Sequence, residues 1–297
     1  MTLTKRLARA RRAFFRDDSA PVQGRSAPAR SGVEYFYLSP ELALTRLLNG
    51  YLLYIDPQDE TMSAHLIGHG YWEPNVYSVV WSLVRPGDTV VEVGANVGYY
   101  TVAMAALVGE AGSVTSFEAN PRLAEMVEKS AYINGFKKHV RVVPKAVFET
   151  PGTIKFDASR KRSGWGHVST DGRAAFEDSV VLDVEATNLD AHYTGPVDFI
   201  RLDAEGSEPF ILRGGQRTIE ASPGVVICME WDPIQMAGRT SLPEFIEWLH
   251  ALGFRSWRIG LDGSLTAVDA DRMIDLETCD IVCSRTDPVA RRHRVRG

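Results

Sequence analysis

The chain has 297 residues, of which 44% are hydrophobic and 24% charged, a composition that suits one α/β domain with extensions. No apolar run approaches the roughly 20 residues of a membrane span, and the first residues lack the apolar core of a secretory signal peptide. The three cysteines, Cys228, Cys279 and Cys283, have no CxxC spacing, so neither a disulfide framework nor a zinc site is indicated. We therefore expect a cytoplasmic protein.

Charge is unevenly distributed along the chain. Residues 1–16 carry six Lys or Arg and no acid, and residues 288–297 carry four Arg and no acid. The body between them is more acidic than the net charge of −5 implies, which argues against a nucleic-acid-binding face. We expect residues 1–32 to be a basic tail and linker. Its apolar residues have helical spacing, so it could be partly helical, lie on an anionic membrane, dock on a partner or support a homodimer.

The globular part begins at residue 33. Residues 33–85 are expected to form an N-terminal cap region, with a helix near 39–49, a strand at 51–56 and a helix over 73–84. The Arg85–Asp88 turn then opens the main domain, 86–287, which is followed by a basic C-terminal tail, 288–297. In this domain strands and helices alternate. Strands are predicted at 89–95, 113–119, 140–147, 197–206, 224–231, 256–260 and 280–285, and an inserted hairpin at 152–158 and 180–186. Helices are predicted at 97–109, 121–134 and 242–252, with a short helix that ends at Gly214-Gly215.

Such alternation predicts a mostly parallel sheet with helices on both faces. Ligands of these sheets bind at the carboxyl ends of the strands. At the first of these strand ends the sequence reads Glu92-Val93-Gly94-Ala95-Asn96-Val97-Gly98, and the next strand ends at Glu118. Gly94 and Gly98 allow close approach of the backbone, and Glu118 is placed to accept both hydroxyls of a ribose. Together these features predict an adenosine site.

The site is a poor match for a dinucleotide. The G-x-G-x-x-G spacing of a phosphate-binding turn is missing, and Glu92 would repel a pyrophosphate. A Tyr-x-x-x-Lys pair is also missing. S-adenosylmethionine carries cationic groups and no phosphate, so it suits an acidic cleft better than NAD. An NAD-dependent oxidoreductase is therefore the disfavoured alternative.

Three separated stretches resemble the FkbM family of methyltransferases. They are GYWEPNVYSVVWSLVRPGDTVVEVGANVGYYTVAMAALVG with the FEANP that follows it, and VDFIRLDAEGSEPFILRGG. The resemblance covers roughly residues 65–231. It implies a Rossmann-like class I methyltransferase fold with a seven-stranded sheet, and O-methylation of sugars, polyketides or related metabolites with S-adenosylmethionine.

The resemblance also implies the cofactor contacts. Glu92, Gly94, Asn96 and Gly98 would form the turn on the methionine side, Glu118 would hold the ribose, Ala119 and Asn120 would lie beside the adenine, and Glu73 would approach the amino end. We add Ala95, Tyr99, Ala146 and Asp203 to these predicted cofactor-binding residues. The chain departs from the family pattern in having Glu92 where Asp is common and Ala119 where Pro is common.

Methyl transfer to a hydroxyl needs alignment and a base. The strand that ends at Asp203 is followed by Glu205 and Glu208, so Asp203 and Glu205 are the leading candidates for base or acceptor positioning. Glu208 either contacts the acceptor or charges the first turn of a helix. Trp165 and His167, on a glycine-rich loop, are predicted to cover the acceptor, and His167 is an alternative base.

Two further acids, Glu230 and Asp232, follow the neighbouring strand and are placed with the acceptor contacts. With Asp203 and Glu205 they could also hold Mg²⁺, although we expect no metal. N-methylation of a small molecule, or a non-catalytic S-adenosylmethionine-binding module, remain alternatives. A nucleic-acid methyltransferase is less favoured because the body is acidic and lacks an Asn-Pro-Pro-Tyr run.

Overall fold

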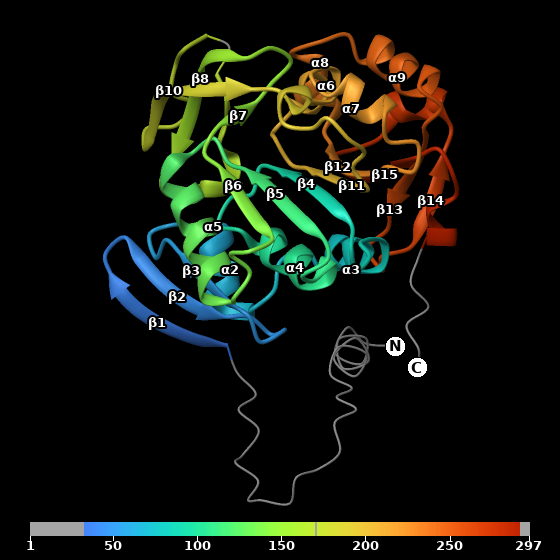
Figure 1. Cartoon of the computed structure of the whole chain (residues 1–297). Coiled ribbons are helices and arrows are strands. Elements are labelled where there is room, and N and C mark those ends of the chain that lie inside the picture. The colour runs from blue at the N-terminus through green and yellow to red at the C-terminus, as the bar shows by residue number, and fades with distance from the viewer. Residues whose placement is uncertain (1–32, 170, 292–297) are drawn as a thin grey trace, which may run out of the picture.

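The computed structural model describes residues 33–169 and 171–291, and its centre is an eight-stranded sheet (Figure 1). The strand order is β14-β13-β15-β12-β11-β4-β5-β6. The strands are β4 (Thr89–Val93), β5 (Ser113–Phe117), β6 (Val140–Val143), β11 (Phe199–Leu202), β12 (Val226–Trp231), β13 (Arg255–Ile259), β14 (Leu265–Val268) and β15 (Cys279–Ser284). Strands β6, β5, β4, β11 and β12 are parallel, and β15 runs antiparallel between β12 and β13. This is the expected Rossmann-like class I methyltransferase architecture, with β14 as one additional edge strand.

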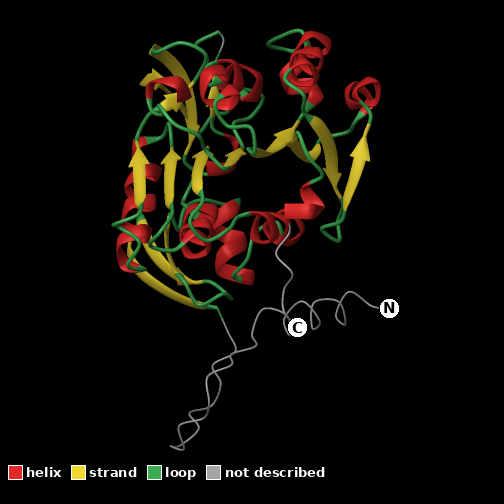
Figure 2. Ribbon diagram, turned by 45° about the vertical axis from the view of Figure 1, so that its right-hand side comes forward, coloured by secondary structure: helices red, strands yellow, loops and turns green. Residues whose placement is uncertain are grey.

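Helices cover both faces of this sheet (Figure 2). Adjacent valines of β4 show why: Val90 packs into one buried cluster and Val91 into another on the opposite face. Strands buried on both faces read as continuous apolar runs, which is how they were recognised in the sequence. The helices are α3 (Pro74–Leu83), α4 (Tyr99–Val108), α5 (Pro121–Ile133), α6 (Glu208–Arg213), α7 (Gln216–Glu220), α8 (Pro233–Ala237) and α9 (Leu242–Ala251).

The helix predicted near 39–49 is wrong. Residues 34–55 form a three-stranded antiparallel sheet of β1 (Glu34–Ser39), β2 (Leu42–Arg46) and β3 (Leu52–Ile55). In β2 burial alternates, with Ala43 and Thr45 fully buried between half-buried neighbours. The leucines of this segment fit a helical spacing as well as an alternating one, and pairing with β1 and β3 decides in favour of the strand.

This small sheet is joined to the main domain through α5. The Tyr54 amide donates to the Ser130 hydroxyl (2.9 Å), and the Leu52 amide donates to the Asn134 side-chain oxygen (3.0 Å). A further helix, α2 (Met62–His69), was not predicted; its Leu66 shares a buried cluster with Leu53. The predicted cap region is therefore continuous with the core under the main sheet.

The inserted hairpin is confirmed as part of a second sheet. Strands β8 (Gly152–Ser159) and β10 (Ser179–Thr187) pair antiparallel, flanked by β9 (His167–Val168) and β7 (Ala146–Val147). The strand predicted over 140–147 is split at Pro144, where β6 ends and the chain passes into the second sheet as β7. Proline has no N–H to donate, so a ladder is readily interrupted there.

The N-terminal tail lies outside the described residues, but the C-terminal basic segment lies partly inside them. Arg291 bonds to Asp88 (2.8 Å) and to the carbonyls of Leu83 and Gly224. The start of the predicted tail therefore belongs to the fold. Within residues 33–169 and 171–291, no helix is long and apolar enough to cross a membrane.

Candidate active site

A cavity of about 270 Å³ opens at the carboxyl ends of β4, β5, β11 and β12. The main sheet, α2, α4, α5 and the second sheet all contribute to its wall, as do Trp72 and Glu73 just before α3. Predicted site residues in its lining are Glu73, Gly94, Ala95, Asn96, Glu118, Ala119, Asn120, Ala146, Trp165, Asp203, Glu205 and Glu230. Residues separated by more than 150 positions in the sequence are thus brought to one edge of the sheet.

The glycine turn after β4 requires its residue types. Gly94 has φ +83°, and a Cβ there would lie 1.8 Å from the carbonyl oxygen of Asp203. Asn96 and Gly98 also have positive φ values, and the Gly98 amide donates to the Ala95 carbonyl (2.8 Å). The turn therefore passes against the end of β11 with no room for a side chain at Gly94.

Glu118 fastens this turn from the neighbouring strand end. Its two oxygens accept hydrogen bonds from the backbone amides of Asn96 (2.7 Å) and Asn120 (2.8 Å). Burial raises the pKa of this carboxyl to about 7. Each carboxylate oxygen accepts more than one hydrogen bond, so acceptor capacity remains for a ligand hydroxyl.

Glu92 has a different position from the one expected. It is fully buried below the turn, where one oxygen accepts hydrogen bonds from the hydroxyls of Thr101 (2.5 Å) and Ser116 (2.7 Å). Burial raises its pKa. In this structure it supports the turn from inside the protein and is not in the cavity lining.

A buried arginine lies between two acids of the cavity lining. Arg201 contacts Asp203 (3.0 Å) and lies 3.9 Å from Glu73, while its guanidinium stacks over the Tyr100 ring (3.7 Å to the centroid). The Tyr100 hydroxyl donates to the same Glu73 oxygen (3.0 Å). Glu73 precedes α3 with φ +38°, in the left-handed region that disfavours side chains.

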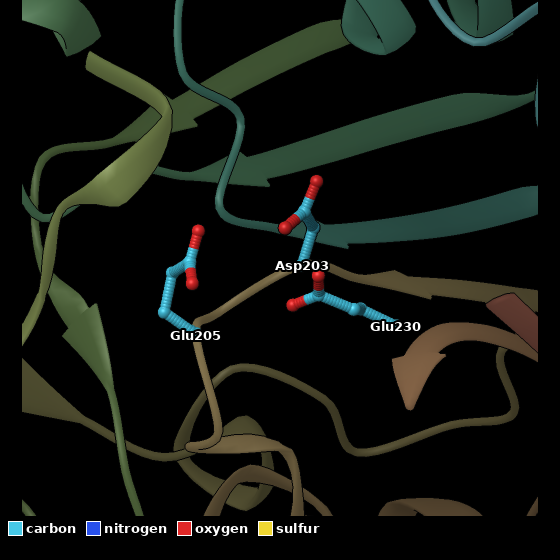
Figure 3. Close-up of side chains that lie close together, drawn as sticks. All are labelled: Asp203, Glu205 and Glu230. Atoms are coloured by element: carbon cyan, nitrogen blue, oxygen red, sulfur yellow. The ribbon is translucent and has the colours of Figure 1, made fainter. Parts of the chain in front are cut away.

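Three carboxylates gather at the ends of β11 and β12. Figure 3 shows Asp203, Glu205 and Glu230 extending into one space, and their oxygens lie within 4.8 Å of one another. Burial raises the pKa of Glu205 to about 7 and that of Glu230 to about 10. One Glu230 oxygen is buried without a hydrogen-bond partner. At neutral pH the cluster therefore retains protons, since neighbouring carboxylates disfavour simultaneous ionisation.

The second sheet forms the outer wall of the cavity. Trp165 is 49% exposed and lies against Phe176 and the Arg162 guanidinium. Its loop is fastened to the N-terminal region because Asp59 accepts hydrogen bonds from the amide (3.1 Å) and hydroxyl (2.9 Å) of Ser163. An apolar ring face is thus presented at the rim of a polar cavity.

Other predicted residues also lie outside the lining. Gly98 and Tyr99 begin α4, where a Cβ on Gly98 would approach Val127. His167 pairs within the second sheet, and its Nδ1 lies 3.1 Å from the Trp165 carbonyl oxygen. Asp232 caps α8 by accepting from the amides of Ile234 and Gln235. These positions favour structural roles.

Glu208 is also buried away from the cavity lining. It accepts a hydrogen bond from the Ala204 amide (2.7 Å) and leaves its other oxygen without a partner. Burial raises its pKa to about 7. The helix-terminal reading of Glu208 is thus favoured over the acceptor contact.

Several lining residues were not anticipated. They include Tyr100, Lys145, Arg201 and Asp280, together with Thr61, Met62 and Trp72 of the N-terminal region. Arg201 was detectable as a charge inside the apolar run FIRL, and Asp280 as an acid at the start of a strand. Burial raises the pKa of Asp280 to about 8.

Comparisons with known proteins agree with this geometry. Residues 92–256 match the methyltransferase FkbM domain. Protein-L-isoaspartate O-methyltransferases of Archaeoglobus fulgidus and Methanopyrus kandleri are 32% identical over 81 residues and 33% identical over 72 residues. These matches cover 26% and 24% of this chain and 38% and 32% of those proteins, so the chain spans well under half the length of the curated relatives.

Two solved structures also resemble the chain at low identity. A methyltransferase FkbM from Methylobacillus flagellatus is 13% identical, with a TM-score of 0.42 over 66% of this chain and 43% of that one. A Bacillus cereus O-methyltransferase in complex with SAH is 14% identical, with a TM-score of 0.41 over 74% and 84%. The match to the FkbM domain covers more than half of the chain. We therefore conclude that the protein belongs to the FkbM family of S-adenosylmethionine-dependent methyltransferases.

Proposed function

We propose that the protein methylates a hydroxyl group of a small molecule, with a sugar, glycosylated or polyketide-type metabolite as the acceptor. The observation that carries this proposal is the group of carboxylates beside the glycine turn. Methylation of a hydroxyl requires removal of a proton, and a base is most effective when its pKa lies near the working pH. Glu205, whose pKa burial raises to about 7, meets that condition.

The lining of the cavity fits S-adenosylmethionine. Glu118 is at the end of β5 with acceptor capacity for ribose hydroxyls, and Asn120 and Ala119 are beside it. Glu73 offers a carboxylate to the cationic amino group of the cofactor. The cationic side chains in the lining are Lys145 and Arg201, and Arg201 is already paired with Asp203, which suits a ligand without phosphates. When bound, S-adenosylmethionine supplies an electrophilic methyl group.

We assign the residues around the cavity different roles according to their positions. Asp203 and Glu205 follow β11, where the Asp203 backbone packs against Gly94 of the cofactor turn, and they take up or orient the acceptor proton. Glu230 holds a proton at neutral pH and donates a hydrogen bond to an acceptor oxygen. Trp165 provides a face on which a sugar ring stacks, and its loop excludes water from the cavity.

N-methylation is the second candidate, and the acidity of the same cluster favours it. Among Asp203, Glu205, Glu230 and Asp280, the carboxylates that are ionised would attract an ammonium-bearing acceptor. Such an amine would lose its proton to one of these carboxylates before attack. A hydroxyl acceptor is preferred because Trp165 forms an aromatic rim suited to a ring with many hydroxyl groups.

The test has two stages. Isothermal titration with S-adenosylhomocysteine, with NAD as control, measures cofactor binding. Acceptor panels of matched alcohols and amines, followed by mass spectrometry for an added methyl group, then separate the two candidates. Methylation of amines alone would replace the first proposal with the second, and binding of NAD alone would overturn both.

A further inference from the structure

Arg201 occupies an unusual place for a charged residue. It is in the four-residue strand β11, all of which is buried, and only 4% of Arg201 is exposed. Among the described residues, it is the one arginine or lysine that the fold buries. A buried guanidinium is costly unless its charge is paired and its donors are used. The fold therefore retains Arg201 because of what surrounds it.

Its surroundings come from three separate elements. Asp203 follows β11 itself, Glu73 precedes α3, and Tyr100 is in the first turn of α4. The guanidinium contacts Asp203 at 3.0 Å and lies 3.9 Å from Glu73, and the Tyr100 ring covers its face at 3.7 Å. Tyr100 also donates to Glu73, so Arg201, Tyr100 and Glu73 form a closed ring of contacts.

We propose that Arg201 is a positioning residue that fixes Asp203 and Glu73 relative to each other in the cavity lining. One guanidinium nitrogen lies near both carboxylates, so their positions depend on the same side chain. Asp203 is presented toward the acceptor and Glu73 toward the amino end of the cofactor. This inference rests on the proposed cofactor site and adds to it the residue that couples these two carboxylates.

The geometry requires arginine rather than lysine. A guanidinium is planar and stacks on an aromatic face, and here the stacking on Tyr100 holds one of its nitrogens near both carboxylates. Lysine would place one compact charge near Asp203 and would lose the stacking on Tyr100. Arg201→Lys therefore retains the charge and removes the orientation, which separates positioning from simple charge neutralisation.

Two ligands report separately on the two carboxylates, Glu73 and Asp203. S-adenosylhomocysteine carries the amino end of the cofactor, which is adjacent to Glu73. Sinefungin carries in addition an amino group where the transferred methyl would be, facing Asp203. The ratio of the two dissociation constants therefore reports on Asp203, and the dissociation constant for S-adenosylhomocysteine reports on Glu73. Both can be measured by titration without knowing the acceptor.

The experiment compares three variants of the full chain with the wild type. Arg201→Lys is expected to weaken S-adenosylhomocysteine about tenfold and sinefungin about a hundredfold, a difference of one decade in affinity. Tyr100→Phe keeps the ring and removes the hydroxyl that Glu73 accepts. It is expected to weaken both ligands by the same several-fold factor, leaving the ratio unchanged. Arg285→Lys is the matched control, because Arg285 stacks on Phe254 (4.4 Å) and bonds carbonyls outside the cavity.

The outcomes distinguish this inference from the proposed function. If the wild type binds neither ligand, the proposed function falls and this inference with it. If the wild type binds and Arg201→Lys reduces both affinities equally, or neither, positioning is overturned and the cofactor site stands. If Arg201→Lys does not fold, the test depends on Tyr100→Phe. Unchanged affinity of that variant for S-adenosylhomocysteine overturns the inference that these contacts position Glu73 for the cofactor.

Discussion

The α-carbon of Gly94 and the carbonyl oxygen of Asp203 approach so closely that a Cβ on Gly94 would lie 1.8 Å from that oxygen. The cofactor turn and the candidate base are therefore packed against each other through backbone atoms. Gly94→Ala should displace the end of β11 and abolish binding of S-adenosylhomocysteine. Its φ of +83° adds strain of about 1–2 kcal/mol for a residue with a Cβ.

Gly135→Ala separates these two effects. Gly135 has a similar φ of +81° and open space where the Cβ would be placed. Urea unfolding should show a loss of about 1–2 kcal/mol for Gly135→Ala and a larger loss for Gly94→Ala. Equal losses, with ligand binding retained in Gly94→Ala, would contradict the close approach.

The glycine turn and Glu118 were predictable from the sequence because they depend on short-range spacing. A buried strand, two glycines four residues apart and an acid at the next strand end fix their relative positions through the parallel sheet. The positions of Asp203 and Glu230, each at the carboxyl end of a strand, follow from the same parallel topology. These residues were predictable because short stretches of sequence define the strands and their ends.

Arg201 and the N-terminal sheet could not be predicted in the same way. Arg201 contacts Glu73, Tyr100 and Asp203, which come from three separate segments, so no local sequence pattern predicts these contacts. Residues 42–48 fit both a helical and an alternating pattern, and only pairing with β1 and β3 distinguishes them. Likewise, Trp165 and His167 belong to the same loop, but its turn places only the tryptophan in the cavity wall.

Glu118 should be important for cofactor binding because it accepts hydrogen bonds from two backbone amides as well as from the ligand. Glu118→Gln replaces one acceptor oxygen with a donor that faces an N–H group. The affinity for S-adenosylhomocysteine should fall at least about tenfold, a cost of about 1.4 kcal/mol. Glu128→Gln on the exposed face of α5 is the matched control and should leave titration curves unchanged.

The acidic cluster should make the ligand-free protein less stable as pH rises. Burial raises the pKa of Glu230 from an ordinary value of 4.5 to about 10 and that of Glu205 to about 7. Between about pH 5 and pH 8 the folded protein keeps protons that the unfolded chain has released. Each such proton lowers the free energy of unfolding by about 1.4 kcal/mol per pH unit.

Glu230→Gln tests this directly. Over pH 5.5–8.5 the free energy of unfolding from urea titrations should fall less steeply in the variant than in the wild type, by up to about 1.4 kcal/mol per unit. Comparison at equal pH removes the contributions of titratable groups distant from the cluster. Parallel curves would show that Glu230 titrates in the folded protein as it does in the unfolded chain.

Asp203 should matter for turnover more than for cofactor binding. With an accepted substrate, Asp203→Asn should lower kcat by about 10²–10⁴, because a base or an orienting carboxylate is lost. Asp232→Asn preserves an N-cap of similar quality and should retain activity. An equal loss of kcat in both variants would show that the effect is not specific to Asp203.

The bonds from α5 to β3 have a consequence for engineering this protein. The amides of Leu52 and Tyr54 are satisfied by side chains of Asn134 and Ser130, and Asn134 also donates back to the Leu52 carbonyl. A truncated protein that begins at residue 86 would lack β3, so the surface of α5 that packs against β3 would be exposed to solvent. The part that begins at residue 86 is therefore not an independent module, and domain grafting or swapping should move residues 33–291 as one piece.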